Sequence, residues 1–250
     1  MWTKMLNSKR ENETIDLEIV CVYNDEKVFW EELINSLLKQ ETKYNVRING
    51  IDNTQGKYLS MAEAYNSVLE LLKGRWTIFL HQDIVFNSKD SLDGIVHELE
   101  KIDTDSIVGS AGVIRNTRKT IVTEGTPIEA ETVDECFFGM TTERFKELKF
   151  NEQLCDNWHM YAAEICLHNK CLNGKVLIIK ADITHLSPGV ISKEYVKTLY
   201  KLIDFYKKLG VESIWTTCAK VDLKGPYKVY ILIWGLKHEV LNKIIRPLKW

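Results

Sequence analysis

Apolar and polar positions alternate along the first part of the chain in a strand-then-helix order. Residues 15–23 form a largely apolar run rich in β-branched side chains, which predicts a buried strand. Asn24 and Asp25 follow it and offer side-chain oxygens that can cap a helix. We expect this helix to carry its apolar side chains on one face, namely Phe29, Leu33, Leu37 and Leu38.

A second unit repeats this order. Residues 44–52 are predicted to form a strand that ends in a polar turn. Ser60 and Glu63 have the spacing of a capping box, so a helix is expected to begin there. Its core-facing residues are Met61, Tyr65, Val68, Leu69 and Leu72. Gly74 ends this helix, and a short apolar strand over residues 76–80 follows.

This alternation predicts the fold class. Parallel strands need a crossover connection, and an amphipathic helix commonly supplies it. We therefore expect an α/β fold whose Rossmann-like, mostly parallel central sheet is flanked by helices. Ligands bind such sheets beyond the carboxyl ends of the strands, where Asn24, Asp52 and Asp83 fall in this chain.

Beyond Asp83 the alternation loosens, and no boundary separates an independent second domain. The expected elements are helices over 91–102, 158–172 and 193–209, strands over 106–114, 132–140 and 175–179, a polar hairpin-like stretch that runs to Gly125, and a loop over 185–189. Residues after about 105 are expected to add a further layer to the same sheet.

Composition excludes several classes of protein. The 250 residues include 33 Lys+Arg and 35 Asp+Glu, and a net charge of -2 gives no cationic surface for nucleic acid. Residues 1–14 lack the apolar run of a signal peptide, and the apolar run 229–234 is too short to cross a bilayer. We expect a cytoplasmic protein. The six cysteines contain no CxxC pair, so neither a zinc site nor a disulfide framework is predicted.

His81, Gln82 and Asp83 directly follow the third predicted strand. A polar turn after a strand is common, and a surface aspartate needs no function. Here, however, a buried strand delivers a carboxylate to a sheet edge that receives polar groups from two other strands. Such a carboxylate suits Mg²⁺ or Mn²⁺, which is commonly held by one or two protein ligands and a substrate diphosphate. Asp83 is therefore predicted to be a metal ligand.

Several motifs follow one another along the chain: 19–24, 50–54, 61–66, 79–83, 137–140, 143–145, 157–167, 174–176 and His185. In this order they resemble glycosyltransferase family 2, which has the GT-A fold, and its small branch of streptomycin-biosynthesis-type proteins. The segment 79–83 is similar to the family's metal-binding Asp-x-Asp motif, with His81 in the first position as in this branch.

The resemblance implies an enzyme that transfers a sugar from a nucleotide-diphosphate donor to a hydroxyl acceptor, a saccharide or a lipid-linked group, with inversion. A divalent cation would stabilise the diphosphate leaving group. The residues implied for the metal are Asp83 and His185, and those implied for the nucleotide are Tyr23, Asn24, Asp52, Asn66 and His81. Because the metal motif lacks its first aspartate, we expect the ion to be held weakly until the nucleotide binds.

The implied organisation is a single GT-A-like domain over residues 1–250. A nucleotide-binding half spans about 15–105, an acceptor-side half about 106–190, and a C-terminal helical extension about 191–250.

The general base is the point at which the chain departs from the family pattern. Ala162 occupies the position that usually carries this acid. An inverting mechanism needs a group within hydrogen-bond reach of the acceptor hydroxyl. Glu164 and His159 are the nearest candidates, and the alternatives on neighbouring segments are Asp134, Glu135 and Asp156.

Each of these residues also has a plainer interpretation. Asp52 can simply end a strand through an Asx turn, and Asn66 can belong to a polar helix face. His185 can be an ordinary loop histidine, His159 a packing group, and Glu164 part of a solvated helix face.

Two other functions stay open. The missing acid at Ala162 favours a catalytically silent module that binds a nucleotide sugar. A metal-dependent hydrolase of nucleotide diphosphate compounds would share the same site and use water as the acceptor.

The C-terminal segment is basic and aromatic. Residues 224–250 contain six basic residues and a single acid, Glu239. Such a segment can lie on an anionic membrane surface, which would place the enzyme at the inner face of the membrane. Alternatively, it docks on the core or on a second copy of the chain in a homodimer. Docking is favoured, because the run 229–234 is apolar all round.

Overall fold

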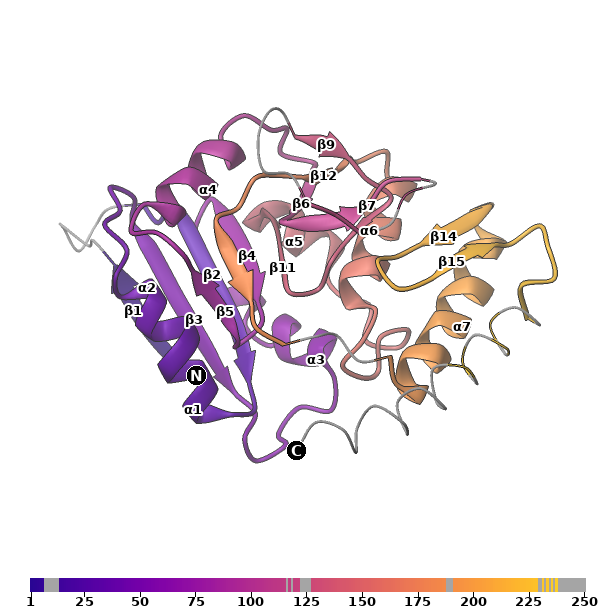
Figure 1. Cartoon of the computed structure of the whole chain (residues 1–250), viewed down its shortest axis with the longest axis horizontal. Coiled ribbons are helices and arrows are strands. Elements are labelled where there is room, and N and C mark those ends of the chain that lie inside the picture. Colours follow the sequence, from indigo (N-terminus) through magenta and orange to yellow (C-terminus); the bar gives the residue numbers. More distant parts are fainter. Residues whose placement is uncertain are drawn as a thin grey trace.

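The computed structural model describes residues 1–6, 14–115, 117, 119–121, 127–187, 191–228, 231, 233, 235 and 237. Within these residues a central sheet of eight strands has the order β1-β3-β2-β4-β11-β6-β12-β9 (Figure 1). The strands are β1 (Trp2–Leu6), β2 (Leu17–Tyr23), β3 (Val46–Asp52), β4 (Trp76–Leu80), β6 (Ile107–Gly109), β9 (Ile128–Glu129), β11 (Phe137–Thr141) and β12 (Val176–Ile178).

The pairings confirm a mostly parallel sheet. β3, β2, β4, β6 and β12 run in one direction, whereas β1, β11 and β9 run in the other. The carboxyl ends of β2, β3 and β4 therefore meet at one edge. β1 was not predicted from the sequence, and it pairs antiparallel to β3 over all five of its residues.

The first helical segment follows β2 as predicted. It comprises α1 (Glu26–Val28), a π-helical turn η1 (Phe29–Ile34) and α2 (Asn35–Leu37). Asp25 caps it by accepting a hydrogen bond from the Val28 amide at 3.1 Å. The expectation that Leu38 belongs to the buried face is wrong, because this side chain is 47% exposed. A π-turn adds a residue to the turn and so rotates later positions away from the face that a regular helix would present.

The second helix, α3 (Met61–Asn66), begins at the predicted cap, and a 3-10 turn η2 (Leu69–Leu71) follows it. Ser60 Oγ accepts from the Glu63 amide at 3.1 Å. Glu63 reaches back one residue further than in a standard capping box, to the Leu59 amide at 2.9 Å. The predicted core-facing residues of this region are all buried.

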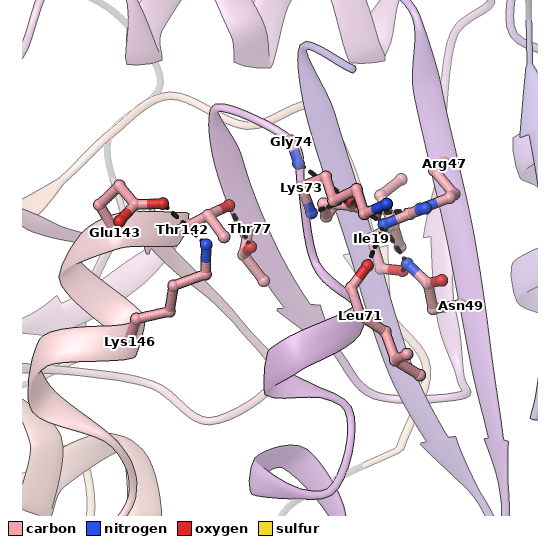
Figure 2. A network of polar contacts seen from close by, with 11 residues as sticks. Ile19, Arg47, Asn49, Leu71, Lys73, Gly74, Thr77, Thr142, Glu143 and Lys146 are labelled. Atoms are coloured by element: carbon pink, nitrogen blue, oxygen red, sulfur yellow. Dashed lines mark hydrogen bonds and ion pairs between the residues drawn. The ribbon is translucent and has the colours of Figure 1, made fainter. Parts of the chain in front are cut away.

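A buried carboxylate ties together the ends of β2, β3 and β4 that lie opposite the ligand edge. Glu18 is fully buried in β2 and accepts hydrogen bonds from Arg47 and Asn49 of β3. The backbone amides of Lys73 and Gly74, which precede β4, donate to the same carboxylate at 2.9 Å (Figure 2). These donors replace the water that an ionised carboxylate loses on burial.

The second half differs from the prediction at two points. The expected strand 106–114 breaks at Ser110 into β6 and β7 (Ala111–Val113), and the expected strand 132–140 breaks into β10 (Thr132–Val133) and β11. The reason is the same at both breaks, since the chain leaves one sheet for another. β7 pairs with β10 and with β8 (Lys119–Ile121) in a separate three-stranded sheet. Part of the predicted hairpin-like stretch before Gly125 lies outside the described residues.

Three further helices lie at or near their predicted positions. They are α4 (Ser91–Leu99), α6 (Tyr161–Cys171) and α7 (Lys193–Lys208), and α5 (Thr142–Leu148) is an additional one. α6 begins three residues later than expected, because Met160 has a φ of 70° and cannot continue a right-handed helix.

Two small sheets complete the fold. β5 (Ile84–Phe86) pairs with β13 (Ile183–His185), and β14 (Ser213–Trp215) pairs with β15 (Lys220–Asp222). His185 was predicted in a loop, but it ends β13, and part of that loop, 188–190, lies outside the described residues.

The described part of the C-terminal segment contacts α7. Ile231 is fully buried in a cluster that includes Leu199 and Ile203. This contact agrees with docking on the core. Most of residues 229–250 lie outside the described part, so membrane contact and a homodimer stay predictions. Among the helices of the described residues, none has the length and apolar character needed to span a bilayer.

Candidate active site

Three side chains of types that can ligate a metal converge at the edge of the sheet, and we call them the triad. His81 and Asp83 follow β4, and His185 ends β13. His185 Nε2 lies 3.2 Å from Asp83 Oδ1 and 3.4 Å from His81 Nδ1. The structure thus brings together two residues that are separated by one position in the chain and a third about a hundred positions later.

Backbone pairing fixes this geometry. The His81 amide donates to the carbonyl of Cys136 at 3.1 Å, which continues the pairing of β4 with β11. In the pairing of β13 with β5, His185 lies opposite Ile84, which is the residue directly after Asp83 in the chain. The amide of Ser187 then donates to Asp83 Oδ2 at 3.2 Å.

The electrostatics favour the protonation states that bind a cation. Burial and the neighbouring His185 lower the pKa of His81 to about 4, so its imidazole is neutral at pH 7. Burial opposes ionisation of Asp83, but hydrogen bonds from His185 and Ser187 outweigh it and lower the pKa of this carboxyl. Neutral imidazole and ionised carboxylate are the forms that coordinate metals.

These three residues fit a divalent cation. One ligand atom from each residue can be chosen so that all lie within 4.8 Å of one another. Ligands that share a cation at a bond length of about 2.1 Å stand about 3 Å apart, close to the spacings observed here. A set of one carboxylate oxygen and two imidazole nitrogens suits Mn²⁺ better than Mg²⁺, which prefers oxygen ligands.

Gln82 connects the ends of β4 and β2. Its Oε1 accepts hydrogen bonds from the backbone amides of Asn24 at 2.9 Å and Asp25 at 3.0 Å. Its Nε2 donates to Asn24 Oδ1 at 2.9 Å. The predicted nucleotide contact Asn24 is therefore held in a fixed orientation, and Gln82 is the residue that holds it.

Two cavities open beside the triad. One has a volume of about 250 Å³, and its lining includes Asn24, Asn53, Gln82 and Asp83. We call it the strand-end cavity. The other has a volume of about 420 Å³ and is lined by residues 133–135, 158–160 and 216–218 and by His81, Ala163, His185, Ser187 and Tyr195. We call it the break cavity, because Asp134 and Glu135 reach it from the break between β10 and β11.

The two cavities share three residues, His81, Trp158 and Ser187. A ligand in one cavity would therefore lie next to a ligand in the other, with the triad at their junction.

Glu135 has an unusual environment in the break cavity. Its Oε1 atom is buried and has no hydrogen-bond partner among the described residues. Burial and the charge of Asp134 raise the pKa of Glu135 to about 8, and the backbone amides of Met160 and Tyr161 oppose this rise. A carboxyl group of this pKa can accept a proton near neutral pH.

Several predicted nucleotide residues lie elsewhere. Tyr23 is buried and stacks on Phe29 with ring centroids 4.1 Å apart. Asn66 bridges to the backbone of Phe150, donating at 2.9 Å and accepting at 3.0 Å. Neither lines the strand-end cavity.

Asp52 is exposed at the end of β3. It accepts from both the amide and the hydroxyl of Thr54 at 2.8 Å, and these bonds lower the pKa of its carboxyl. This is the Asx-turn geometry of the plainer interpretation. Asp52 also lines a third cavity of about 440 Å³ together with Lys57 and Tyr58.

The predicted general bases differ in whether they line a cavity beside the triad. Glu164 is 1% exposed and accepts from the hydroxyl of Tyr206 at 2.8 Å, and it lines neither cavity beside the triad. His159 lines the break cavity, where its Nε2 lies 2.9 Å from Ser192 Oγ. Asp156 is exposed and pairs with Lys201 at 2.6 Å, outside both cavities.

No functional role was predicted for Gln82, Trp158 or the 216–218 turn, and Tyr161 was interpreted only as a packing group with a polar tip. Gln82 stands in the motif between two residues that were singled out, so its position was an available signal. The 216–218 turn carries no such signal, because only the folded chain brings it to this edge.

Comparisons with known proteins agree with this architecture. A GalNAc-T7 structure with UDP, GalNAc and Mn²⁺ is similar with a TM-score of 0.60 at 13% identity, over 78% of this chain and 48% of that one. Residues 1–349 of TarS from S. aureus are similar with a TM-score of 0.52 at 16% identity, over 76% of this chain and 65% of that one. The chain thus spans less than two thirds of either structure. The expected GT-A glycosyltransferase fold is confirmed.

The sequence comparisons point the same way. A Fuscovulum blasticum protein described as ATP synthase subunits region ORF 6 is 25% identical over 179 residues, which are 63% of this chain and 70% of that protein. Residues 18–183 match the model of a family described as "Glycosyltransferase like family". Because this match covers more than half of the chain, the protein belongs to this glycosyltransferase-like family.

Proposed function

We propose that the protein transfers a sugar from a nucleotide-diphosphate donor to a hydroxyl acceptor, with inversion at the anomeric carbon. The observation that carries this proposal is the junction of the two cavities at His81, Trp158 and Ser187, beside the triad. Two reactants that must meet at one carbon atom need two adjacent pockets.

The donor is assigned to the strand-end cavity. Its position beyond the carboxyl ends of β2 and β4 is the usual ligand position in such sheets. TarS has also been described in complex with UDP-GlcNAc, which supports a nucleotide sugar as the donor class. Asn24, fixed by Gln82, and Asn53 supply polar groups toward the nucleotide.

His81, Asp83 and His185 would hold the divalent cation, and their mixed nitrogen and oxygen ligands favour Mn²⁺. When bound, the cation would stabilise the negative charge that develops on the departing diphosphate. The Mn²⁺ in the GalNAc-T7 structure supports this choice.

Glu135 is the proposed general base. Its side chain lines the acceptor side, and its buried Oε1 has no partner among the described residues. Glu135 would take the hydroxyl proton while the acceptor oxygen bonds to the anomeric carbon and the electron pair of the breaking bond leaves with the diphosphate. Glu164 is less suited, because its carboxylate is buried against Tyr206.

Inversion requires the acceptor hydroxyl to lose its proton as it attacks opposite the leaving group, and Glu135 would supply the base for this step on the acceptor side. The test is nucleotide release from UDP-, GDP- and dTDP-sugars with Mn²⁺, measured with and without a library of saccharide acceptors. Release that rises with acceptor, together with a glycosylated product, is expected. Equal release without acceptor would indicate a hydrolase, and nucleotide binding without release would indicate a silent module.

A further inference from the structure

The break cavity is built partly by residues outside the family match. Tyr195 comes from α7, and Thr216, Thr217 and Cys218 form the turn between β14 and β15. All four follow residue 183, where the match to the family ends. This wall is therefore contributed by the part of the chain that the family model does not cover.

Hydrogen bonds attach this wall to the acidic segment. Thr132, two residues before Asp134, donates its hydroxyl to the carbonyl of Trp215 at 2.7 Å. The hydroxyls of Tyr195 and Thr216 lie 2.8 Å apart. Thr216 Oγ1 also accepts from the Ala219 amide at 2.8 Å, which fixes the turn. The turn is thus connected by a hydrogen bond to the segment that carries the two acidic residues.

The charge of the cavity limits what can bind in it. Its described lining residues include the carboxylates of Asp134 and Glu135 but no lysine or arginine. Burial lowers the pKa of His159, which disfavours a positive charge on its imidazole. A phosphate or sulfate group needs cationic partners when it leaves water. The described lining offers no lysine or arginine, and a cation held by His81, Asp83 and His185 would already be paired with the donor diphosphate.

The remaining lining suits a sugar ring. Carboxylates accept hydrogen bonds from hydroxyl groups, and Thr217 adds a hydroxyl that can donate or accept. Trp158 is 36% exposed at the junction of the two cavities. An indole presents an apolar face to the C–H groups of a ring while polar groups around it bind hydroxyls.

We propose that the break cavity selects an uncharged saccharide as acceptor, with Trp158 and the 216–218 turn as the residues that determine this specificity. The proposal rests on the proposed function and adds the class of acceptor to it. Saccharides that carry phosphate or sulfate groups are excluded, because the described lining combines two acidic side chains with no lysine or arginine.

The test uses the full chain saturated with UDP and Mn²⁺ on an array of neutral, phosphorylated and sulfated oligosaccharides. We expect the parent to bind neutral saccharides and to reject the charged ones. Trp158→Ala should weaken this binding by about tenfold or more, because it removes the aromatic face. Trp30→Ala is the matched control, because Trp30 is 38% exposed and lines neither cavity beside the triad.

A second variant tests the turn directly. Thr217→Arg supplies a cation where the described lining has none, so phosphorylated saccharides should then bind. Equal binding of neutral and phosphorylated saccharides by the parent would overturn the proposal. Parental binding by Trp158→Ala, or an unchanged preference in Thr217→Arg, would also overturn it.

Calorimetric titration of the same samples with UDP, GDP and dTDP in the presence of Mn²⁺ separates failure of the proposed function from failure of the proposed acceptor class. Absence of binding of all three nucleotides by the parent would contradict the proposed function itself. UDP binding without any bound neutral saccharide would overturn only the proposed acceptor class.

Discussion

The hydroxyl of Tyr161 lies 2.8 Å from Nε2 of His81 and 3.5 Å from the backbone carbonyl of Glu135. The carbonyl can only accept, so the Tyr161 proton points to it and the hydroxyl accepts from His81 Nε2–H. His81 is then protonated on Nε2, and the lone pair of Nδ1 faces His185. Tyr161 therefore sets the tautomer that a metal site requires.

Tyr161→Phe should consequently weaken Mn²⁺ binding by about tenfold or more, since partners of metal ligands commonly contribute this much. Mn²⁺ binding is measured by electron paramagnetic resonance in the presence of UDP. Tyr65→Phe is the control, because the buried hydroxyl of Tyr65 has no partner among the described residues. Equal losses in both variants would mean that Tyr161 acts only through packing.

Gln82→Ala removes three hydrogen bonds between the ends of β4 and β2. We expect UDP affinity to fall by about tenfold, because Asn24 loses its fixed orientation. Gln40→Ala serves as the control, since Gln40 also bridges separate segments, bonding Ser88 and Leu92, but does not line the strand-end cavity. It should lower the free energy of unfolding and leave UDP affinity unchanged. A loss of UDP affinity in Gln40→Ala but not in Gln82→Ala would contradict the role of Gln82.

Glu135→Gln should lower the rate of sugar transfer by about 100-fold or more while UDP binding is retained. In the parent, burial and Asp134 raise the pKa of Glu135 to about 8, so kcat/KM should rise by about tenfold per pH unit below that value. Asp134→Asn should move this limb to lower pH, because it removes the charge that opposes ionisation. A Glu135→Gln variant with the parental rate and pH profile would remove Glu135 from the mechanism.

Glu164 is predicted to make the free energy of unfolding depend on pH. Burial raises the pKa of its carboxyl from an ordinary value of 4.5 to about 7. Between these pH values the folded chain holds a proton that the unfolded chain has released, so the free energy of unfolding falls as pH rises through this window. Glu164→Gln should remove this loss, which is on the order of 3 kcal/mol. Urea unfolding at pH 5 and pH 8 measures the free energy of unfolding of the parent and the variant. A difference between parent and variant that is equal at both pH values would contradict the prediction.

The first half of the fold was accessible from the sequence because each element there is specified locally. The apolar run of β4 and the caps at Asp25 and Ser60 lie in neighbouring residues, and the structure has them as predicted. The breaks at Ser110 and at Asp134–Cys136 were not accessible, because they arise where the chain leaves one sheet for another. A continuous apolar pattern gives no sign of such a change of partner.

The residues of the candidate site also differ in how far the sequence could predict them. Asp83 could be predicted from a strand end, and His185 only through the family resemblance, because its contact with Asp83 depends on the pairing of β13 with β5. Glu135 was one of several open alternatives, since its burial and its proximity to Asp134 are properties of the folded chain.

The most direct test of the central claim is calorimetric titration of UDP, GDP and dTDP with and without Mn²⁺. The parent should bind one of these nucleotides more tightly with Mn²⁺, and Asp83→Ala should lose this Mn²⁺-dependent gain. Asp204→Ala, which changes an exposed aspartate of α7, should behave as the parent does. An Asp83→Ala variant that binds all three nucleotides like the parent, with the same dependence on Mn²⁺, would contradict the claim that the triad holds a cation against a nucleotide diphosphate.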